Sequence, residues 1–177
     1  MSLEVIKRES GLSGFVAREL NPSRDLASMR KVHELRFQIY CLEQGFLDAV
    51  DYPEGCEADE HDARSYHFAS WGDQGDVAGY VRLVRPDAIG TFPFQNHCLT
   101  LEAGVNSPPA HLSAEISRLM VAADYRRQPD RSPAILCNLF MQMHACSVRD
   151  GVRYWYAAME RSLVRVLQRM LGIEFQQ

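Results

Sequence analysis

The sequence lacks the features of a disulfide framework, a zinc site or a membrane span. Its five cysteines are an odd number and form no C-x-x-C pair, which predicts free thiols in a reducing compartment and a cytoplasmic protein. No apolar run approaches the roughly 20 residues of a membrane-spanning helix, and the N-terminus has no signal-peptide core. The six histidines are dispersed, so we expect neither a metal nor a tightly bound cofactor.

Lysine is also scarce, because only Lys7 and Lys31 accompany seventeen arginines. Arginine grips carboxylates and phosphates with two parallel hydrogen bonds, where lysine acts as a point charge; a GC-rich coding sequence would also produce this bias. The formal net charge of −4 argues against a nucleic-acid partner. The chain has 177 residues, and we expect one domain over 1–177.

Hydrophobic periodicity and turn residues predict the element order β-α-β-β-loop-β-α-β-α-β. The expected strands are residues 14–20, 65–71, 76–85, 113–122, 152–158 and 173–177. The expected helices are residues 24–42 with Ser23 as N-cap, 133–149 and 160–171. Antiparallel hairpins come first, and two helical crossovers then imply parallel neighbours. The pattern indicates an α/β (α+β) protein with a mixed central sheet flanked by helices.

Two short charged clusters stand out. Residues 57–62 carry an E-x-D-x-x-D pattern, and residues 115–118 carry E-x-S-R inside an apolar run. Charged side chains are rarely buried without partners, because desolvating an ion costs several kcal/mol. The clusters therefore favour a binding or catalytic site. A solvated acidic loop at 57–62, and a structural ion pair of Glu115 with Arg82 or Arg118, are the alternatives.

The order of these motifs resembles the autoinducer synthases, the LuxI-type N-acyl-homoserine-lactone synthases of the GNAT superfamily. The matching elements are Leu35-Arg36-Phe37-Gln38-Ile39-Tyr40, the aromatic Phe46, Glu57-x-Asp59-x-x-Asp62, Gly79-Tyr80-Val81-Arg82-Leu83 and Glu115-x-Ser117-Arg118. Tyr40 stands where that family usually has phenylalanine, and Phe46 where it has tryptophan. In these departures, and in the long loop before Glu57, the sequence resembles the N-acyl amino acid synthases and acyltransferases associated with the PEP-CTERM/exosortase system.

The resemblance implies a GNAT acyl-CoA N-acyltransferase-like fold with a V-shaped splay between strands 113–122 and 152–158. It also implies an N-acyltransferase that moves a fatty acyl group from acyl carrier protein or acyl-CoA onto an amine. S-adenosylmethionine as acceptor leads to an N-acyl-homoserine lactone, a quorum-sensing signal, and a free amino acid leads to an N-acyl amino acid. The alternative is a non-catalytic GNAT-fold module that binds an acyl carrier or a small amine.

On the acceptor side, carboxylates are expected to hold the ammonium group and act as general base. The candidates for this catalytic role are Glu57, Asp59, Asp62 and Glu115. Clustering of like charges is expected to raise the pKa of at least one of them. The candidates for substrate binding are Arg36, Phe46, Arg82, Ser117 and Arg118. A surface arginine is the alternative for Arg36, and core packing is the alternative for Phe46, Phe92 and Phe94. No histidine stands at a triad spacing from Ser117, so direct transfer is expected.

On the donor side, the resemblance places the backbone of Leu119, Met120 and Val121 at the splay, where it would polarise the thioester carbonyl. The phosphate of the donor is expected at the turn before the helix at 133. That turn has no glycine but carries Arg126, Arg127 and Arg131, which suits an acidic acyl carrier protein better than free coenzyme A. The alternative is a solvated basic turn.

Overall fold

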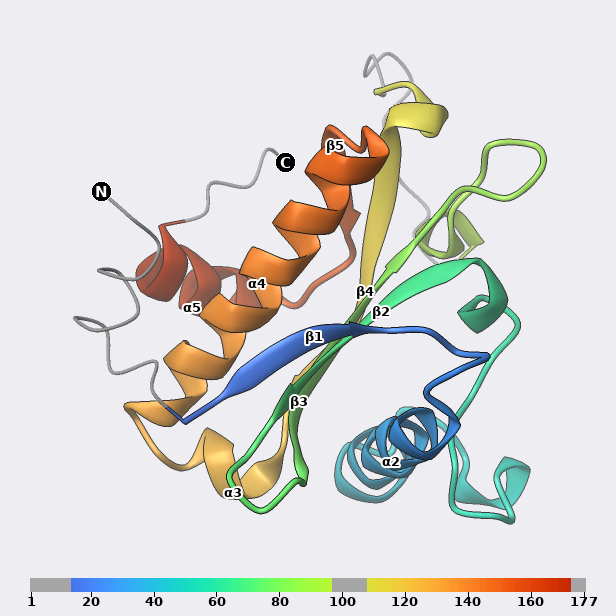
Figure 1. The fold of residues 1–177 in the computed structure, drawn as a ribbon. Helices are drawn as coiled ribbons and strands as arrows, with labels where there is room; N and C mark the ends of the chain where they lie inside the picture. The colour runs from blue at the N-terminus through green and yellow to red at the C-terminus, as the bar shows by residue number, and fades with distance from the viewer. Residues whose placement is uncertain (1–13, 97–107, 173–177) are drawn as a thin grey trace.

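The computed structural model describes residues 14–96 and 108–172, which form a five-stranded mixed sheet with helices on both faces (Figure 1). The strands are β1 Val16–Leu20, β2 Ser65–Trp71, β3 Val77–Val84, β4 Ser113–Val121 and β5 Tyr154–Ala157. The helices are α2 Leu26–Phe37, α3 Ala123–Arg126, α4 Arg131–Asp150 and α5 Arg161–Leu171. The sheet order is β1-β2-β3-β4-β5, with three antiparallel pairings followed by the parallel pair β4–β5. The GNAT-like mixed sheet expected from the sequence is confirmed.

Short helical turns connect these elements. They are η1 Gln38–Glu43, which is a π-helix, η2 Ala49–Asp51, η3 Asp62–Arg64, η4 Pro93–Asn96 and η5 Ala110–Leu112. Within the residues that the structure describes, no helix is both long and apolar enough to cross a bilayer. The strand expected at 173–177 and Cys98 lie outside the described residues.

The first helix differs from its predicted form at both ends. Ser23 is not the N-cap, because the helix begins at Leu26 and Asp25 takes the cap position, while Ser23 lies in the preceding turn with its N–H bonded to the Asn21 side chain. At its C-terminal end the α-helix changes into the wider π-helical turn η1. Such π-turns are rare and occur frequently at functional sites. Further along, α3 was not expected, and α4 begins at Arg131, two residues earlier than predicted.

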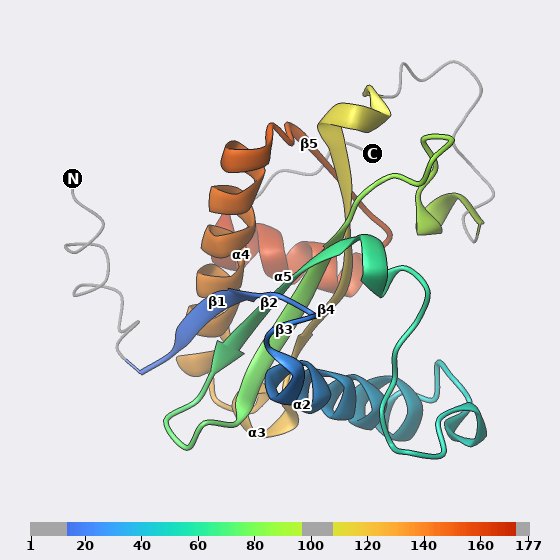
Figure 2. The same ribbon diagram turned by 45° about the vertical axis from the view of Figure 1, so that its right-hand side comes forward.

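Helices cover both faces of the sheet (Figure 2). All eight residues of β3 are buried, as expected for a strand that is covered on both sides. On one face, Ile135, Leu139 and Met143 of α4 pack into the larger hydrophobic core. On the other face, α2 contributes Met29 and Val32 to a smaller core around the β3 side chain of Tyr80.

The sheet opens between β4 and β5. Their ladder runs from the Ser113–Tyr154 pair to the Ile116–Ala157 pair and ends there, although β4 continues to Val121. Immediately beyond this point the β3–β4 ladder has a bulge, and Arg118 takes a left-handed conformation with φ of 55°. The parallel strands thus separate where the E-x-S-R pattern lies, as the resemblance to the GNAT fold implied.

The helix α4 packs closely over Gly79 of β3. A Cβ atom at this position would lie 2.5 Å from Ile135 Cγ2 and 3.0 Å from the Met120 carbonyl oxygen. We expect Gly79→Ala to lower the free energy of unfolding in urea by about 1–3 kcal/mol, because the helix or strand must shift. Ile135→Ala removes the crowded methyl group, so the double variant should lose less than the sum of the two single losses. Additive losses would contradict this close contact.

Candidate functional site

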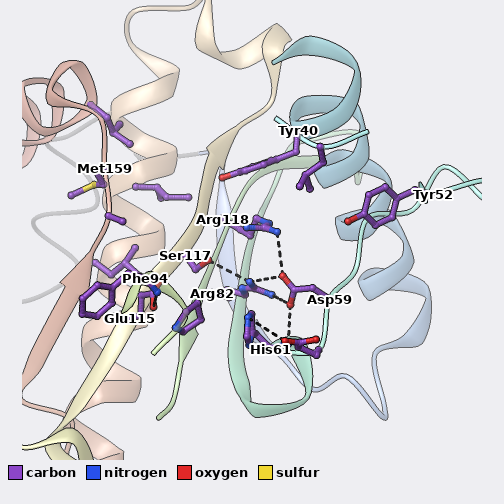
Figure 3. A pocket seen from close by; sticks show the side chains of 17 residues that line it. Tyr40, Tyr52, Asp59, His61, Arg82, Phe94, Glu115, Ser117, Arg118 and Met159 are labelled. Carbon is purple, nitrogen blue, oxygen red and sulfur yellow. Dashed lines mark hydrogen bonds and ion pairs between the residues drawn. The ribbon is translucent and has the colours of Figure 1, made fainter. Parts of the chain in front are cut away.

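A pocket of about 500 Å³ lies where β4 and β5 separate (Figure 3). Its apolar wall includes Leu119 of β4, and Ala158, Met159 and Leu163 from the segment that follows β5. The opposite wall is polar and charged. Its residues are Tyr40, Tyr52, Asp59, Glu60, His61, Arg82 and Arg118. Glu115 and Ser117 of β4 also line the pocket.

The polar wall rests on a buried network of alternating charges, which we call the charge network. Its members are Arg36, Glu57, Asp59, Asp62, Arg82 and Arg118. Arg36 of α2 donates from Nε and Nη2 to the two carboxylate oxygens of Glu57, at 2.6 and 2.9 Å, and from Nη1 to Asp62 Oδ1 at 2.7 Å. The side chains of Arg36 and Glu57 are both fully buried. Arg36 is therefore not a surface arginine.

Two arginines of the sheet complete the network. Arg82 of β3 donates to both carboxylate oxygens of Asp59, at 2.6 and 2.8 Å, and to Asp62 Oδ1 at 2.6 Å. Arg118 of β4 donates to both oxygens of Glu57, at 3.2 and 3.0 Å, and to Asp59 Oδ2 at 3.2 Å. Three guanidinium groups balance three carboxylates, and this pairing offsets the large cost of burying the individual ions.

The network lowers the carboxyl pKa values. Burial by itself would raise the pKa of Glu57, but hydrogen bonds from Arg36 and Arg118 outweigh it, and the pKa is lowered. For Asp59 burial is likewise outweighed, chiefly by Arg82, and for Asp62 by Arg36 and Arg82. The prediction that clustering raises a carboxyl pKa is therefore wrong for these three residues, because each carboxylate faces arginines from elsewhere in the fold.

The four predicted catalytic acids do not share one position. Asp59 and Glu115 line the pocket, whereas Glu57 and Asp62 lie behind its surface within the charge network. Asp59 is 22% exposed, and the Glu57 side chain is not exposed at all. Glu115 is buried on β4 and accepts a hydrogen bond from the Phe94 backbone N–H at 2.9 Å. Of the four acids, Asp59 and Glu115 are therefore the ones placed to contact a ligand in this pocket.

The aromatic residues also divide. Phe94 lines the pocket and packs beside Tyr156, with ring centroids 5.2 Å apart. Phe92 is buried and contacts both rings. Phe46, in contrast, is 60% exposed and does not line the pocket; its ring lies edge-on against Tyr40 at 5.8 Å. The structure thus places Phe46 behind Tyr40, one layer away from the pocket.

The predicted donor-binding residues lie along and beyond the end of β4. Leu119 lines the pocket, whereas Met120 and Val121 are buried in the hydrophobic cores. The arginines of the following turn do not line the pocket. Arg126 forms an ion pair with Glu43, the Arg131 guanidinium lies over the rings of Phe15 and Tyr125, and Arg127 is exposed.

Several pocket residues carry no signal in the sequence. Met159 and Leu163 come from the segment after β5, which has no motif.

His61 Nδ1 lies 3.2 Å from Arg64 Nη2. Since a guanidinium can only donate, Nδ1 accepts, and a neutral ring carries its proton on Nε2. In the chain outside 1–13, 97–107 and 173–177, no three histidines, cysteines or acids are grouped as ligands for a metal ion.

Comparison with known families agrees with this fold. A family model described as "Acetyltransferase (GNAT) domain" matches residues 35–132, which is more than half of the chain. The chain therefore belongs to the GNAT family and is an acyltransferase. No curated protein sequence matches the chain.

Solved structures place the fold within this superfamily. The chain is similar to the AHL synthase LasI, with 19% identity and a TM-score of 0.67 over 88% of this chain and 77% of that one. The CoA-dependent acyl-homoserine lactone synthase BjaI, with SAM and isopentyl-CoA, shows 20% identity and a TM-score of 0.68 over 88% and 72%. A GNAT acetyltransferase from Staphylococcus aureus Mu50 is 12% identical, with a TM-score of 0.51 over 89% and 81%. The likeness to LuxI-type synthases is a likeness of fold.

The lowered carboxyl pKa values predict acid sensitivity. A carboxyl group whose pKa is lowered in the folded state stabilises the fold fully above its unfolded pKa of about 4, and it loses this contribution as the pH falls towards the folded pKa. We expect the free energy of unfolding, measured in urea, to decline steeply below about pH 4. Asp62→Asn should make this decline shallower and lower stability at pH 7 by about 3–5 kcal/mol, because Arg36 and Arg82 lose an ionised partner.

The matched control is Asp124→Asn, which changes an exposed aspartate outside the charge network. In this variant the free energy of unfolding should decline below about pH 4 as it does in the wild-type protein. Identical slopes below pH 4 for Asp62→Asn and the wild type would show that the charge network does not control acid stability.

Proposed function

We propose that this acyltransferase moves an acyl group from a thioester donor onto the amine of a small molecule. One observation carries the proposal. The β4–β5 ladder opens directly into a pocket that has an apolar wall on one side and, on the other, a polar wall that includes the carboxylates of Asp59 and Glu60. Such a pocket suits a reaction in which an acyl chain and an ammonium group meet at one β-strand.

The donor would enter through the opening of the sheet. β4 extends five residues beyond its last pair with β5, from Ser117 to Val121. Backbone N–H and C=O groups along this edge are the natural partners of the amides of a pantetheine arm, and an N–H here can polarise the thioester carbonyl. Leu119, Met159 and Leu163 offer apolar contacts to the acyl chain.

The acceptor would bind at the opposite wall through its positive charge. The described residues that line the pocket include the carboxylates of Asp59, Glu60 and Glu115. Asp59, which reaches the pocket from the network and is 22% exposed, can attract an ammonium group by its charge. Carboxylates at the pocket surface favour an acceptor that carries a positively charged group.

Glu115 is the general base in this proposal. Figure 3 shows it beside Phe94, on the other side of Ser117 from Arg118. Asp59 is a weak base, because Arg82 and the other arginines lower its pKa. Glu115 takes a first proton from the ammonium and releases it to solvent, and the neutral amine nitrogen then bonds to the thioester carbon. Glu115 takes the second proton from that nitrogen as the C–S bond breaks and passes it to the departing thiolate, so an amide, a neutral thiol and one proton released to water result.

Two acceptors and two donors fit this chemistry. S-adenosylmethionine carries a net positive charge and would yield an N-acyl-homoserine lactone; a zwitterionic free amino acid would yield an N-acyl amino acid. The charge of the pocket supports the first. The donor is acyl-CoA or acyl carrier protein, and the similar fold of BjaI, with SAM and isopentyl-CoA, supports testing acyl-CoA first.

Thiol release tests the function directly. We expect acyl-CoA or acyl carrier protein to release thiol when S-adenosylmethionine or an amino acid is present, and mass spectrometry of the product identifies the acceptor. Glu115→Gln keeps the shape of the side chain but cannot accept the proton, so kcat should fall about 100-fold or more.

Glu34→Gln is the control, since Glu34 pairs with Arg30 on the surface of α2. It should keep wild-type turnover. A wild-type protein that binds acyl-CoA but releases no thiol with any of these acceptors would instead be a non-catalytic binding module, and the proposed function would be wrong.

A further inference from the structure

Tyr40 is held in place on the polar wall of the pocket. It lies in the π-helical turn η1, and its carbonyl oxygen accepts hydrogen bonds from the N–H groups of Phe46 and Leu47 at 2.8 and 3.2 Å. The Arg118 guanidinium lies 4.7 Å from the centroid of the Tyr40 ring, and Phe46 supports the ring edge-on. Backbone and ring are therefore both fixed, as a preorganised group requires.

The Tyr40 hydroxyl is aimed into the pocket. Figure 3 shows its hydroxyl end pointing towards β4, and Tyr40 lines the pocket. Among the residues that the structure describes, this hydroxyl has no hydrogen-bond partner, whereas Ser117 Oγ lies 3.4 Å from Arg82 Nη2. Tyr52, the other tyrosine labelled in the view, lies on the side of the charge network away from β4. Tyr40 thus presents an unused donor at the open stretch of β4.

We propose that the Tyr40 hydroxyl donates a hydrogen bond to the carbonyl oxygen of the bound thioester and stabilises the oxyanion formed during acyl transfer. The inference rests on the proposed function and adds a catalytic residue to it. When the amine nitrogen bonds to the carbonyl carbon, an electron pair moves onto oxygen. Tyr40 stabilises that charge and keeps its own proton. The pair then returns, the C–S bond breaks, and the proton held by Glu115 passes to the thiolate.

The chemistry of Tyr40 suits a donor that is not consumed. Burial raises its pKa, although the charge of Arg118 acts in the opposite direction, so the phenol stays protonated at neutral pH. A group that keeps its proton is a poor general acid but a good oxyanion donor, and preorganised donors of this kind contribute strongly to catalysis. The autoinducer-synthase pattern has phenylalanine at this position, so the hydroxyl distinguishes this chain from that pattern.

Tyr40→Phe tests the role, because it removes only the hydroxyl and keeps the ring between Arg118 and Phe46. We expect kcat to fall about 100-fold, the effect of losing one oxyanion donor, with little change in the KM for acyl-CoA. The infrared carbonyl stretch of ¹³C-labelled acyl-CoA, bound without an amine, should lie at higher wavenumber in the variant than in the wild type. Tyr154→Phe, at an exposed position on β5, should change neither quantity.

Three outcomes would overturn the proposal. Unchanged kcat and an unchanged carbonyl stretch in Tyr40→Phe would exclude any contact with the thioester oxygen. Recovery of full activity with an aryl thioester would assign the hydroxyl to the leaving group instead. If Tyr40→Phe does not fold, 3-fluorotyrosine at position 40 keeps the hydroxyl and makes it a stronger donor. The stretch should then move to lower wavenumber, and an unmoved stretch would overturn the proposal.

Failure of the proposed function remains distinguishable from failure of this inference. A wild-type protein that releases no thiol with any donor and acceptor overturns the function, and the catalytic role of Tyr40 with it. An active wild-type protein whose Tyr40→Phe variant is equally active overturns the role of Tyr40 alone.

Discussion

The charge network is the constraint on which the site depends. Its members come from α2, the loop at 57–62, β3 and β4, so it ties four separate parts of the chain together. The loop at 57–60 belongs to neither helix nor strand, and its carboxylates are held largely by the arginines. Breaking a buried ion pair leaves an uncompensated charge and typically costs about 3–5 kcal/mol. The charge network thus holds the polar wall of the pocket in a fixed position.

β4 is irregular where it contacts the charge network, because Arg118 is left-handed and the ladder to β3 has a bulge. The left-handed φ of Arg118 is costly for a residue with a side chain, by about 1–2 kcal/mol. The bulge turns Arg118 towards Glu57 and Asp59 and brings its guanidinium against the Tyr40 ring. Strained backbone of this kind persists only where its surroundings hold it in place, as they do at many functional sites. Directly beside the bulge, the ladder to β5 ends, so one stretch of strand serves both the charge network and the opening of the sheet.

The sequence predicted the frame of the molecule better than its electrostatics. Alternation and turn residues located the strands, with β2 at its predicted bounds, whereas the pairing of Arg82 and Arg118 with the carboxylates at 57–62 was not predicted. The sign of the carboxyl pKa shifts was wrong, because the pattern at 57–62 shows like charges side by side and not the arginines that reach them across the fold.

Other differences come from contacts that no local pattern encodes. The arginine-rich turn has no visible partner in the sequence, but in the fold Arg126 meets Glu43, eighty-three residues away, and Arg131 covers two aromatic rings. Phe46 was expected at the substrate because the resemblance has an aromatic residue there. The π-helical turn instead places Tyr40 at the pocket, with Phe46 behind it.

A crystal structure with an acyl-CoA analogue whose thioester is replaced by a ketone would test the central claim most directly. The claim predicts a pantetheine arm that passes between residues 117–121 of β4 and the segment after Ala157, with its carbonyl oxygen facing β4 and Tyr40 and the charge network intact beneath the acceptor pocket. An analogue bound on another face of the sheet, or a β4–β5 ladder that continues past Ile116, would contradict the account.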